Sequence, residues 1–198
     1  MNSTMPDNLT DSILAAVDKY RHDDDLGSLL DRLKQLAAPA DAGSLLLAAT
    51  KFRDIPEVAI PLYERIVALR PDDAQAMVIL ANAYWLTGRG PDVVGGLASN
   101  AIAVDPSNRG AWHLWALAEP AIRERVSRWQ QVAVRFPADQ LARAALADNA
   151  ASLAGAEHDP AALDLAIATY ESLLRESQHP DQRSALETTL TTLRSWRL

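Results

Sequence analysis

The chain has 198 residues, of which 48% are hydrophobic and 23% are charged, and its formal net charge is −7 at neutral pH. This composition is typical of a globular protein with a sizeable core, and the acidic balance disfavours general binding to nucleic-acid phosphates. The absence of cysteine excludes disulfides, thiolate metal sites and cysteine nucleophiles.

The first ten residues, MNSTMPDNLT, contain neither the basic stretch nor the apolar stretch of a secretory signal peptide. Along the rest of the chain, no apolar run approaches the ~20 residues that a membrane-spanning helix needs. We therefore expect a cytoplasmic protein without a membrane partner.

Apolar residues recur at helical spacing from one end of the chain to the other. Leu186, Leu190 and Leu193 form one such stripe, and glycines such as Gly88 and Gly155 follow the end of a stripe. Because no segment shows the two-residue alternation of a strand, the sequence predicts an all-α fold with about eleven helices. We expect them at about 8–21, 25–37, 41–53, 56–70, 73–87, 91–104, 108–118, 120–135, 138–154, 160–176 and 180–196.

Three prolines punctuate the middle of the chain at a nearly constant interval. Pro71, Pro106 and Pro137 are separated by 35 and 31 residues, and each lies between two apolar helical stretches. Proline pushes the preceding residue out of helical geometry, and the Asp or Asn close to each proline can cap the next helix. A stop and restart about every 34 residues is typical of helix-pair repeats.

Residues 74–106 resemble the tetratricopeptide repeat. The matching positions on the first helix of this repeat are Met77, Leu80, Ala81 and Tyr84, with Gly88 at the turn and Val93, Leu97, Ala101 and Pro106 on and after the second helix. Degenerate copies precede and follow it, with their matching residues at Ala59, Tyr63, Ile66 and Pro71, at Trp112 and Ala116, and at Ala147, Ala166 and Tyr170.

The resemblance implies a right-handed solenoid of antiparallel helix pairs, in which each pair buries what its neighbour exposes. We expect one repeat domain over residues 1–198. It would comprise a divergent N-terminal pair at 8–37, tetratricopeptide-like repeats at 41–176 and a capping helix at 180–196.

No motif for catalysis, metal binding or cofactor binding is present. The four histidines lie in different parts of the chain, and no pair of them has the spacing of a helical metal site. The phosphate-binding, dinucleotide-binding and nucleophile-elbow motifs are also missing. The sequence therefore predicts a protein without enzymatic activity, metal or cofactor.

Tetratricopeptide proteins often bind peptides on the concave face formed by the first helices. The resemblance places Asn82 at the position of the asparagine in a clamp for terminal carboxylates, but Ser44 and Val78 stand where that clamp has a lysine. For Trp85, packing in the core is the alternative to binding. The predicted partner-binding residues are Gln75, Val78, Asn82, Trp85, His113 and Leu117.

Residues 109–143 carry six bases and three acids, which makes this the only basic part of the chain. A basic patch at Arg109, Arg123, Arg125 and Arg128 would attract an acidic partner. The alternative is an ordinary solvated helix face.

The leading hypothesis is therefore a scaffold or adaptor that binds a segment of another protein, acidic in character, and binds no nucleic acid. The alternative is a regulatory or accessory subunit that binds a small ligand in the same groove. A homo-oligomer is left open.

Overall fold

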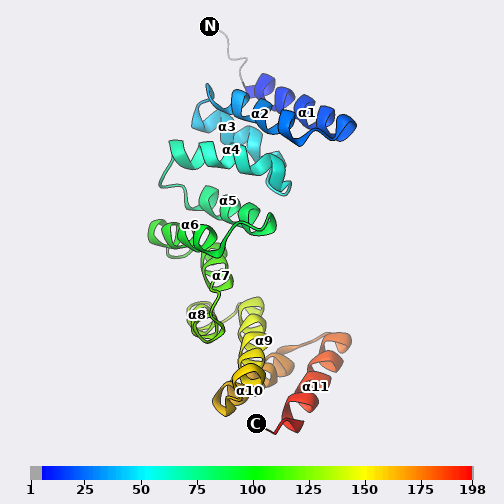
Figure 1. The fold of residues 1–198 in the computed structure, drawn as a ribbon. Coiled ribbons are helices and arrows are strands. Elements are labelled where there is room, and N and C mark those ends of the chain that lie inside the picture. Colours follow the sequence, from blue (N-terminus) through cyan, green and yellow to red (C-terminus); the bar gives the residue numbers. More distant parts are fainter. Residues whose placement is uncertain (1–5, 198) are drawn as a thin grey trace. The chain divides into compact units, whose positions relative to one another are not determined.

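The computed structural model describes residues 6–197, and all the regular elements in this range are helical (Figure 1). The predicted all-α fold is confirmed for these residues, and the predicted helix boundaries are correct to within about three residues. The described helices are α1 (Pro6–Asp23), α2 (Leu26–Ala37), α3 (Ala42–Ala49) followed by a short 3-10 turn (Thr50–Phe52), α4 (Pro56–Leu69), α5 (Ala74–Leu86), α6 (Pro91–Val104), α7 (Arg109–Leu117), α8 (Ile122–Arg135), α9 (Gln140–Glu157), α10 (Pro160–Glu176) and α11 (Pro180–Ser195).

The expected capping residues start the helices that follow the three spaced prolines. The Asp73 carboxylate accepts a hydrogen bond from the third backbone N–H of α5 at 2.9 Å, and Asn108 and Asp139 do the same for α7 and α9 at 3.2 Å. Each such cap stabilises a helix by about 1 kcal/mol because it satisfies an N–H group that has no partner inside the helix.

The three spaced prolines end helices and do not begin them. Each follows a residue with non-helical backbone geometry, as at Arg70 with a φ of −132° before Pro71, and the next helix starts three residues after the proline. Prolines at the first helical position occur elsewhere, as at Pro91 and Pro160.

The chain divides into two compact units, Met1–Leu114 and Trp115–Leu198, with the boundary inside α7. In the first unit, α1 packs against α2 and α3, α2 and α3 pack against α4, and α4 and α6 pack on either side of α5. In the second unit, α9 packs against α8 and α10, and α11 packs against α10. Each unit is thus a stack of neighbouring helix pairs, while a single domain over the whole chain stays a prediction.

In the first unit, the side chains of α5 at the tetratricopeptide-matching positions are buried. Leu80 and Tyr84 of α5 pack inward, and the Tyr84 hydroxyl donates a hydrogen bond to a Glu64 carboxylate oxygen of α4 at 2.6 Å. Burial, together with this bond to Glu64, raises the pKa of Tyr84 to about 12. The bond therefore fixes α5 to the preceding helix.

In the second unit, polar pairs and aromatic contacts join consecutive helices. Trp129 is buried, and the guanidinium of Arg143 on α9 donates to both carboxylate oxygens of Glu176 on α10, at 2.6 and 2.5 Å. Trp196, just after α11, lies so close to α9 that a side chain added at Gly155 would contact its ring at 3.4 Å.

Within residues 6–197, none of the helices is long and apolar enough to cross a lipid bilayer. The same residues contain no cluster of three or more histidine, aspartate or glutamate side chains that could hold a metal ion.

Candidate functional site

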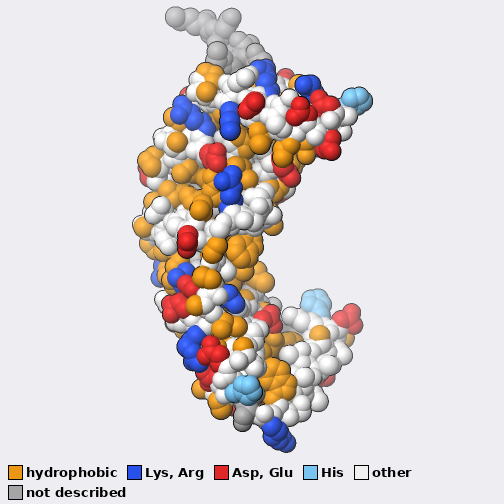
Figure 2. All heavy atoms as spheres, viewed as in Figure 1, with side chains coloured by type: hydrophobic (Ala, Val, Ile, Leu, Met, Phe, Trp, Pro, Cys, Tyr) orange, Lys and Arg blue, Asp and Glu red, His pale blue; other side chains and the backbone are white. Residues whose placement is uncertain are grey.

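Helix α5 of the first unit differs from an ordinary solvent-facing helix. Its 13 residues include no charged side chain, although one whole face is not buried. Trp85 and Leu86 on this face are 38% and 61% exposed, so neither is a core residue. In Figure 2, hydrophobic side chains reach the surface over α4, α5 and α6 with few charged groups among them. The α5 surface is defined here as Gln75, Val78, Asn82, Trp85 and Leu86, which share one side of the helix.

Gln75, Val78 and Asn82 of the α5 surface differ in how many contacts their side chains make with the rest of the chain. The Gln75 side-chain oxygen accepts a long hydrogen bond, 3.5 Å, from Asn108, and Val78 is half-buried against the start of α7, where a side chain at Gly110 would approach it to 3.1 Å. Asn82 is exposed, and its amide forms no hydrogen bond with any residue between 6 and 197. Both the donor and the acceptor of Asn82 are therefore open to a ligand.

The C-terminal end of α5 holds the backbone beside Trp85 in place. Gly88 has a left-handed φ of +73°, which a glycine adopts without strain, and it donates to the Trp85 carbonyl at 3.2 Å. Arg89 then donates its backbone N–H to the Tyr84 carbonyl at 2.9 Å, which completes the glycine-based helix end known as a Schellman motif.

Arg89 was not among the residues singled out from the sequence. Its guanidinium carbon lies 5.0 Å from the centre of the Tyr84 ring, in a cation–π contact. The sequence signal that could have found it is the Gly88–Arg89 pair directly after an uncharged helix, because the residue that follows such a glycine turns back over the last helical turn.

The two predicted residues on α7 belong to different units. His113 is half-buried in the first unit, on the helix whose start contacts Val78. Leu117 is exposed but lies in the second unit. The structure thus brings Gln75, Val78, Asn82 and Trp85 onto one helix face, with His113 on a helix that packs against it.

The predicted basic patch is divided in the same way, since Arg109 lies in the first unit and the other three arginines lie in the second. Arg123 of α8 is paired with Glu157 at 2.5 Å and with Asp159 at 2.9 Å, both near the end of α9. The backbone N–H of Ala162 and the Arg123 guanidinium hold the pKa of the Asp159 carboxyl below its usual range. This pairing offsets the positive charge of Arg123.

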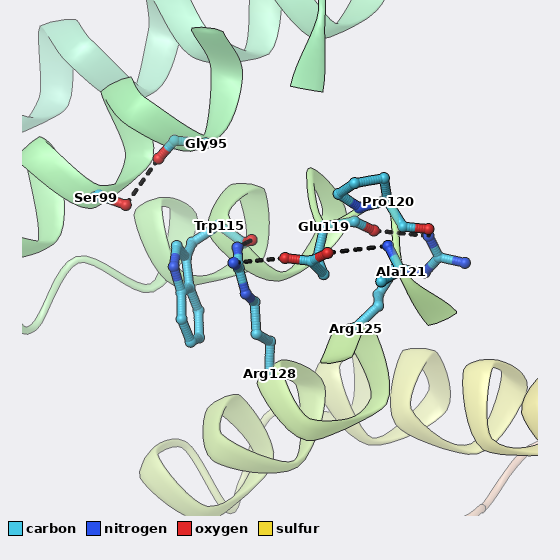
Figure 3. A network of polar contacts seen from close by, with 8 residues as sticks. All are labelled: Gly95, Ser99, Trp115, Glu119, Pro120, Ala121, Arg125 and Arg128. Atoms are coloured by element: carbon cyan, nitrogen blue, oxygen red, sulfur yellow. Dashed lines mark hydrogen bonds and ion pairs between the residues drawn. The ribbon is translucent and has the colours of Figure 1, made fainter. Parts of the chain in front are cut away.

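Arg128 is built into the turn between α7 and α8 (Figure 3). Its guanidinium stacks at 4.5 Å on the Trp115 ring, donates to the Trp115 carbonyl at 2.9 Å and pairs with the Glu119 carboxylate at 2.6 Å. Arg125, one helical turn earlier, donates to the Glu119 carbonyl at 2.7 Å and to the Asn149 side chain at 2.8 Å.

These contacts satisfy carbonyl groups in the last turn of α7 and just after it. α7 ends at Leu117, and the carbonyls near a helix end have no N–H partner inside the helix. Arg125 and Arg128 supply the missing donors. Their guanidinium groups are therefore structural parts of the second unit, and together with Arg123 they are matched by carboxylates and carbonyls of the chain itself.

No family model matches the sequence, and no curated protein matches it. Solved structures do share the fold. The crystal structure of MamA superposes with a TM-score of 0.60 at 18% identity, covering 82% of this chain and 96% of MamA. TTC0263, a thermophilic TPR protein from Thermus thermophilus, superposes with a TM-score of 0.55 at 17% identity, covering 92% of this chain and 99% of TTC0263. YrrB, described as a TPR protein with an unusual peptide-binding site, superposes with a TM-score of 0.57 at 15% identity. The superposition covers 86% of this chain and 88% of YrrB. The chain therefore adopts a tetratricopeptide-like repeat fold.

Proposed function

We propose that the chain is a non-catalytic interaction module that binds a segment of a partner protein on the α5 surface. One observation carries the proposal: an uncharged helix exposes Trp85 and Leu86 beside the open amide of Asn82. Exposed apolar groups that are gathered on one element, and not scattered singly, are typical of interaction sites.

The chemistry of these side chains suits a polypeptide ligand. Tryptophan is among the residues that most often dominate binding energy, because its large ring loses much water-exposed area on contact. Asn82 can donate to a backbone carbonyl and accept from a backbone N–H at the same time. Gln75 lies seven residues earlier, which is about 10 Å along the helix axis and matches about three residues of an extended segment.

The shared fold supports a binding role. YrrB has a peptide-binding site by its description, and its chain is covered to 88% by the superposition. A scaffold or adaptor function agrees with this likeness and with the missing catalytic motifs.

A small ligand in the groove, the alternative function, is less well supported. The cavity next to α5 has a volume of about 600 Å³, and its lining is dominated by charged loop side chains such as Arg70, Asp72 and Asp105. Of the α5 surface, only Gln75 contributes to it. Trp85 and Asn82 instead lie on an open surface, which favours an elongated ligand.

The test is a selection of random displayed peptides on the purified chain, followed by affinity measurements with Trp85→Ala, Asn82→Ala and a matched control. Leu69→Ala is that control, because Leu69 is also 38% exposed but lies on α4. We expect Trp85→Ala to weaken binding about tenfold or more, and Leu69→Ala to change it less than about twofold. Circular dichroism checks that each variant is folded. The proposal is wrong if no peptide is selected, or if Trp85→Ala and Leu69→Ala weaken binding equally.

A further inference from the structure

We infer that Arg89 binds a carboxylate of the partner, so that the α5 surface selects segments in which an acidic residue lies close to a large apolar one. This inference rests on the proposed function and adds the chemistry of the partner. It also moves the expected preference for acidic partners from the arginines of α8 to a residue at the end of α5.

The guanidinium of Arg89 is oriented but not neutralised. It is exposed, it lies over the Tyr84 ring, and it makes no hydrogen bond or ion pair with any side chain in the described part of the chain. The ring contact involves no hydrogen bond to an oxygen, so the guanidinium N–H groups are left to donate to a ligand. A carboxylate fits such a planar fork with two parallel hydrogen bonds.

Two carboxylates have other roles: that of Glu64, which bonds to the same Tyr84, and that of Asp92, three residues after Arg89. Glu64 accepts the hydrogen bond of the Tyr84 hydroxyl at 2.6 Å. Asp92 lies in the first turn of α6, where a negative charge is stabilised by the unpaired N–H groups of the helix start. Neither is paired with Arg89, so the acceptor that this guanidinium lacks can come from a ligand.

The arginines of α8 contrast with Arg89. Arg123 and Arg128 are held by carboxylates of the chain at 2.5–2.9 Å, and a ligand would have to displace these partners before it could bind there. A ligand carboxylate can bind Arg89 without first displacing a carboxylate of the chain. In the sequence, Arg89 follows Trp85 and Leu86 by four and three residues, at the end of α5.

The arrangement gives the bound segment a direction. An apolar side chain packs against Trp85 and Leu86, an aspartate or glutamate next to it reaches Arg89, and the rest of the segment runs along α5 past Asn82. The peptides selected on the chain should therefore be enriched in an acidic residue adjacent to an aromatic or aliphatic one.

The experiment is a double-mutant cycle on a selected peptide whose binding depends on Trp85. The chain carries Arg89→Gln, and the peptide carries glutamine or asparagine in place of its acid. We expect Arg89→Gln to weaken the acidic peptide about 3- to 10-fold and the amide peptide less than about twofold, with a smaller difference in 0.5 M salt. Arg32→Gln is the matched control, because Arg32 is an exposed arginine on α2 that also lacks a partner among residues 6–197, and the same charge is removed.

Arg89→Lys provides a second variant in case the glutamine variant is unstable. It keeps the charge but not the planar fork, so we expect it to retain part of the preference for the acidic peptide. Selected peptides without acidic enrichment, or equal effects of Arg89→Gln and Arg32→Gln, would overturn the inference about Arg89 and leave the α5 surface intact. Peptides that bind independently of Trp85 would instead overturn the proposed function.

Discussion

Replacing Arg128 by alanine tests whether the arginines of α8 are structural. The substitution removes the ion pair with Glu119, the bond to the Trp115 carbonyl and the stack on the Trp115 ring. It also leaves the Glu119 carboxylate without its partner at a position where its side chain is only 12% exposed. A carboxylate that loses its ion-pair partner at such a position destabilises the folded chain, because little water reaches it to solvate the charge.

The magnitude follows from how deeply the pair is buried. Removing one partner of a fully buried pair costs about 3–5 kcal/mol. The Arg128 side chain is 22% exposed, and its Nε has no hydrogen-bond partner, so the native arrangement is not ideal. We therefore expect Arg128→Ala to lower the free energy of unfolding by about 2–4 kcal/mol.

Urea unfolding followed by circular dichroism measures this change, with Arg123→Ala as the control. Arg123 is also paired with carboxylates, but its side chain is 61% exposed, and solvent-exposed pairs contribute little. The reasoning is refuted if the two variants lose the same stability, or if Arg128→Ala unfolds at the urea concentration of the parent chain with an unchanged slope.

Two further predictions concern the first unit. Leu80→Ala should lower the free energy of unfolding by about 2–5 kcal/mol because it leaves a cavity beneath α5, and coincident urea midpoints for variant and parent would show that Leu80 is not in the core. Because the fold raises the pKa of Tyr84 to about 12, its protonated hydroxyl contributes fully to the free energy of unfolding below pH 10. This contribution is lost as the pH rises from 10 to 12. The stability difference between the parent and Tyr84→Phe should therefore narrow from pH 9 to pH 11, and a constant difference would contradict the assignment.

The sequence was sufficient to predict the helices and which side of α5 is buried, because the signals for both are local. Asp73 and Gly88 mark the start and the end of the helix, and the spacing of Leu80 and Tyr84 identifies its buried side. Trp85, one residue after Tyr84, then lies about 100° further around the helix, outside this buried side. Its exposure could not be predicted, because exposure depends on whether another helix covers that face.

The roles of the arginines could not be predicted for a related reason. Arg128 binds groups 9 and 13 residues away in the sequence, so these contacts form only when the chain turns between α7 and α8. Counting charges over residues 109–143 indicates a basic segment, whereas the folded chain pairs Arg123, Arg128 and Arg143 with its own carboxylates.

The most direct test of the α5 surface uses the absence of cysteine from the chain. Asn82→Cys places a single thiol in the middle of the α5 surface, and Asn100→Cys places one at an exposed asparagine of α6 as the matched control. The rate of alkylation of each thiol is measured with and without a saturating peptide from the selection. The account predicts that the bound peptide slows alkylation at position 82 severalfold and leaves the rate at position 100 unchanged. Equal rates at position 82 with and without peptide, or protection at position 100 alone, would contradict it.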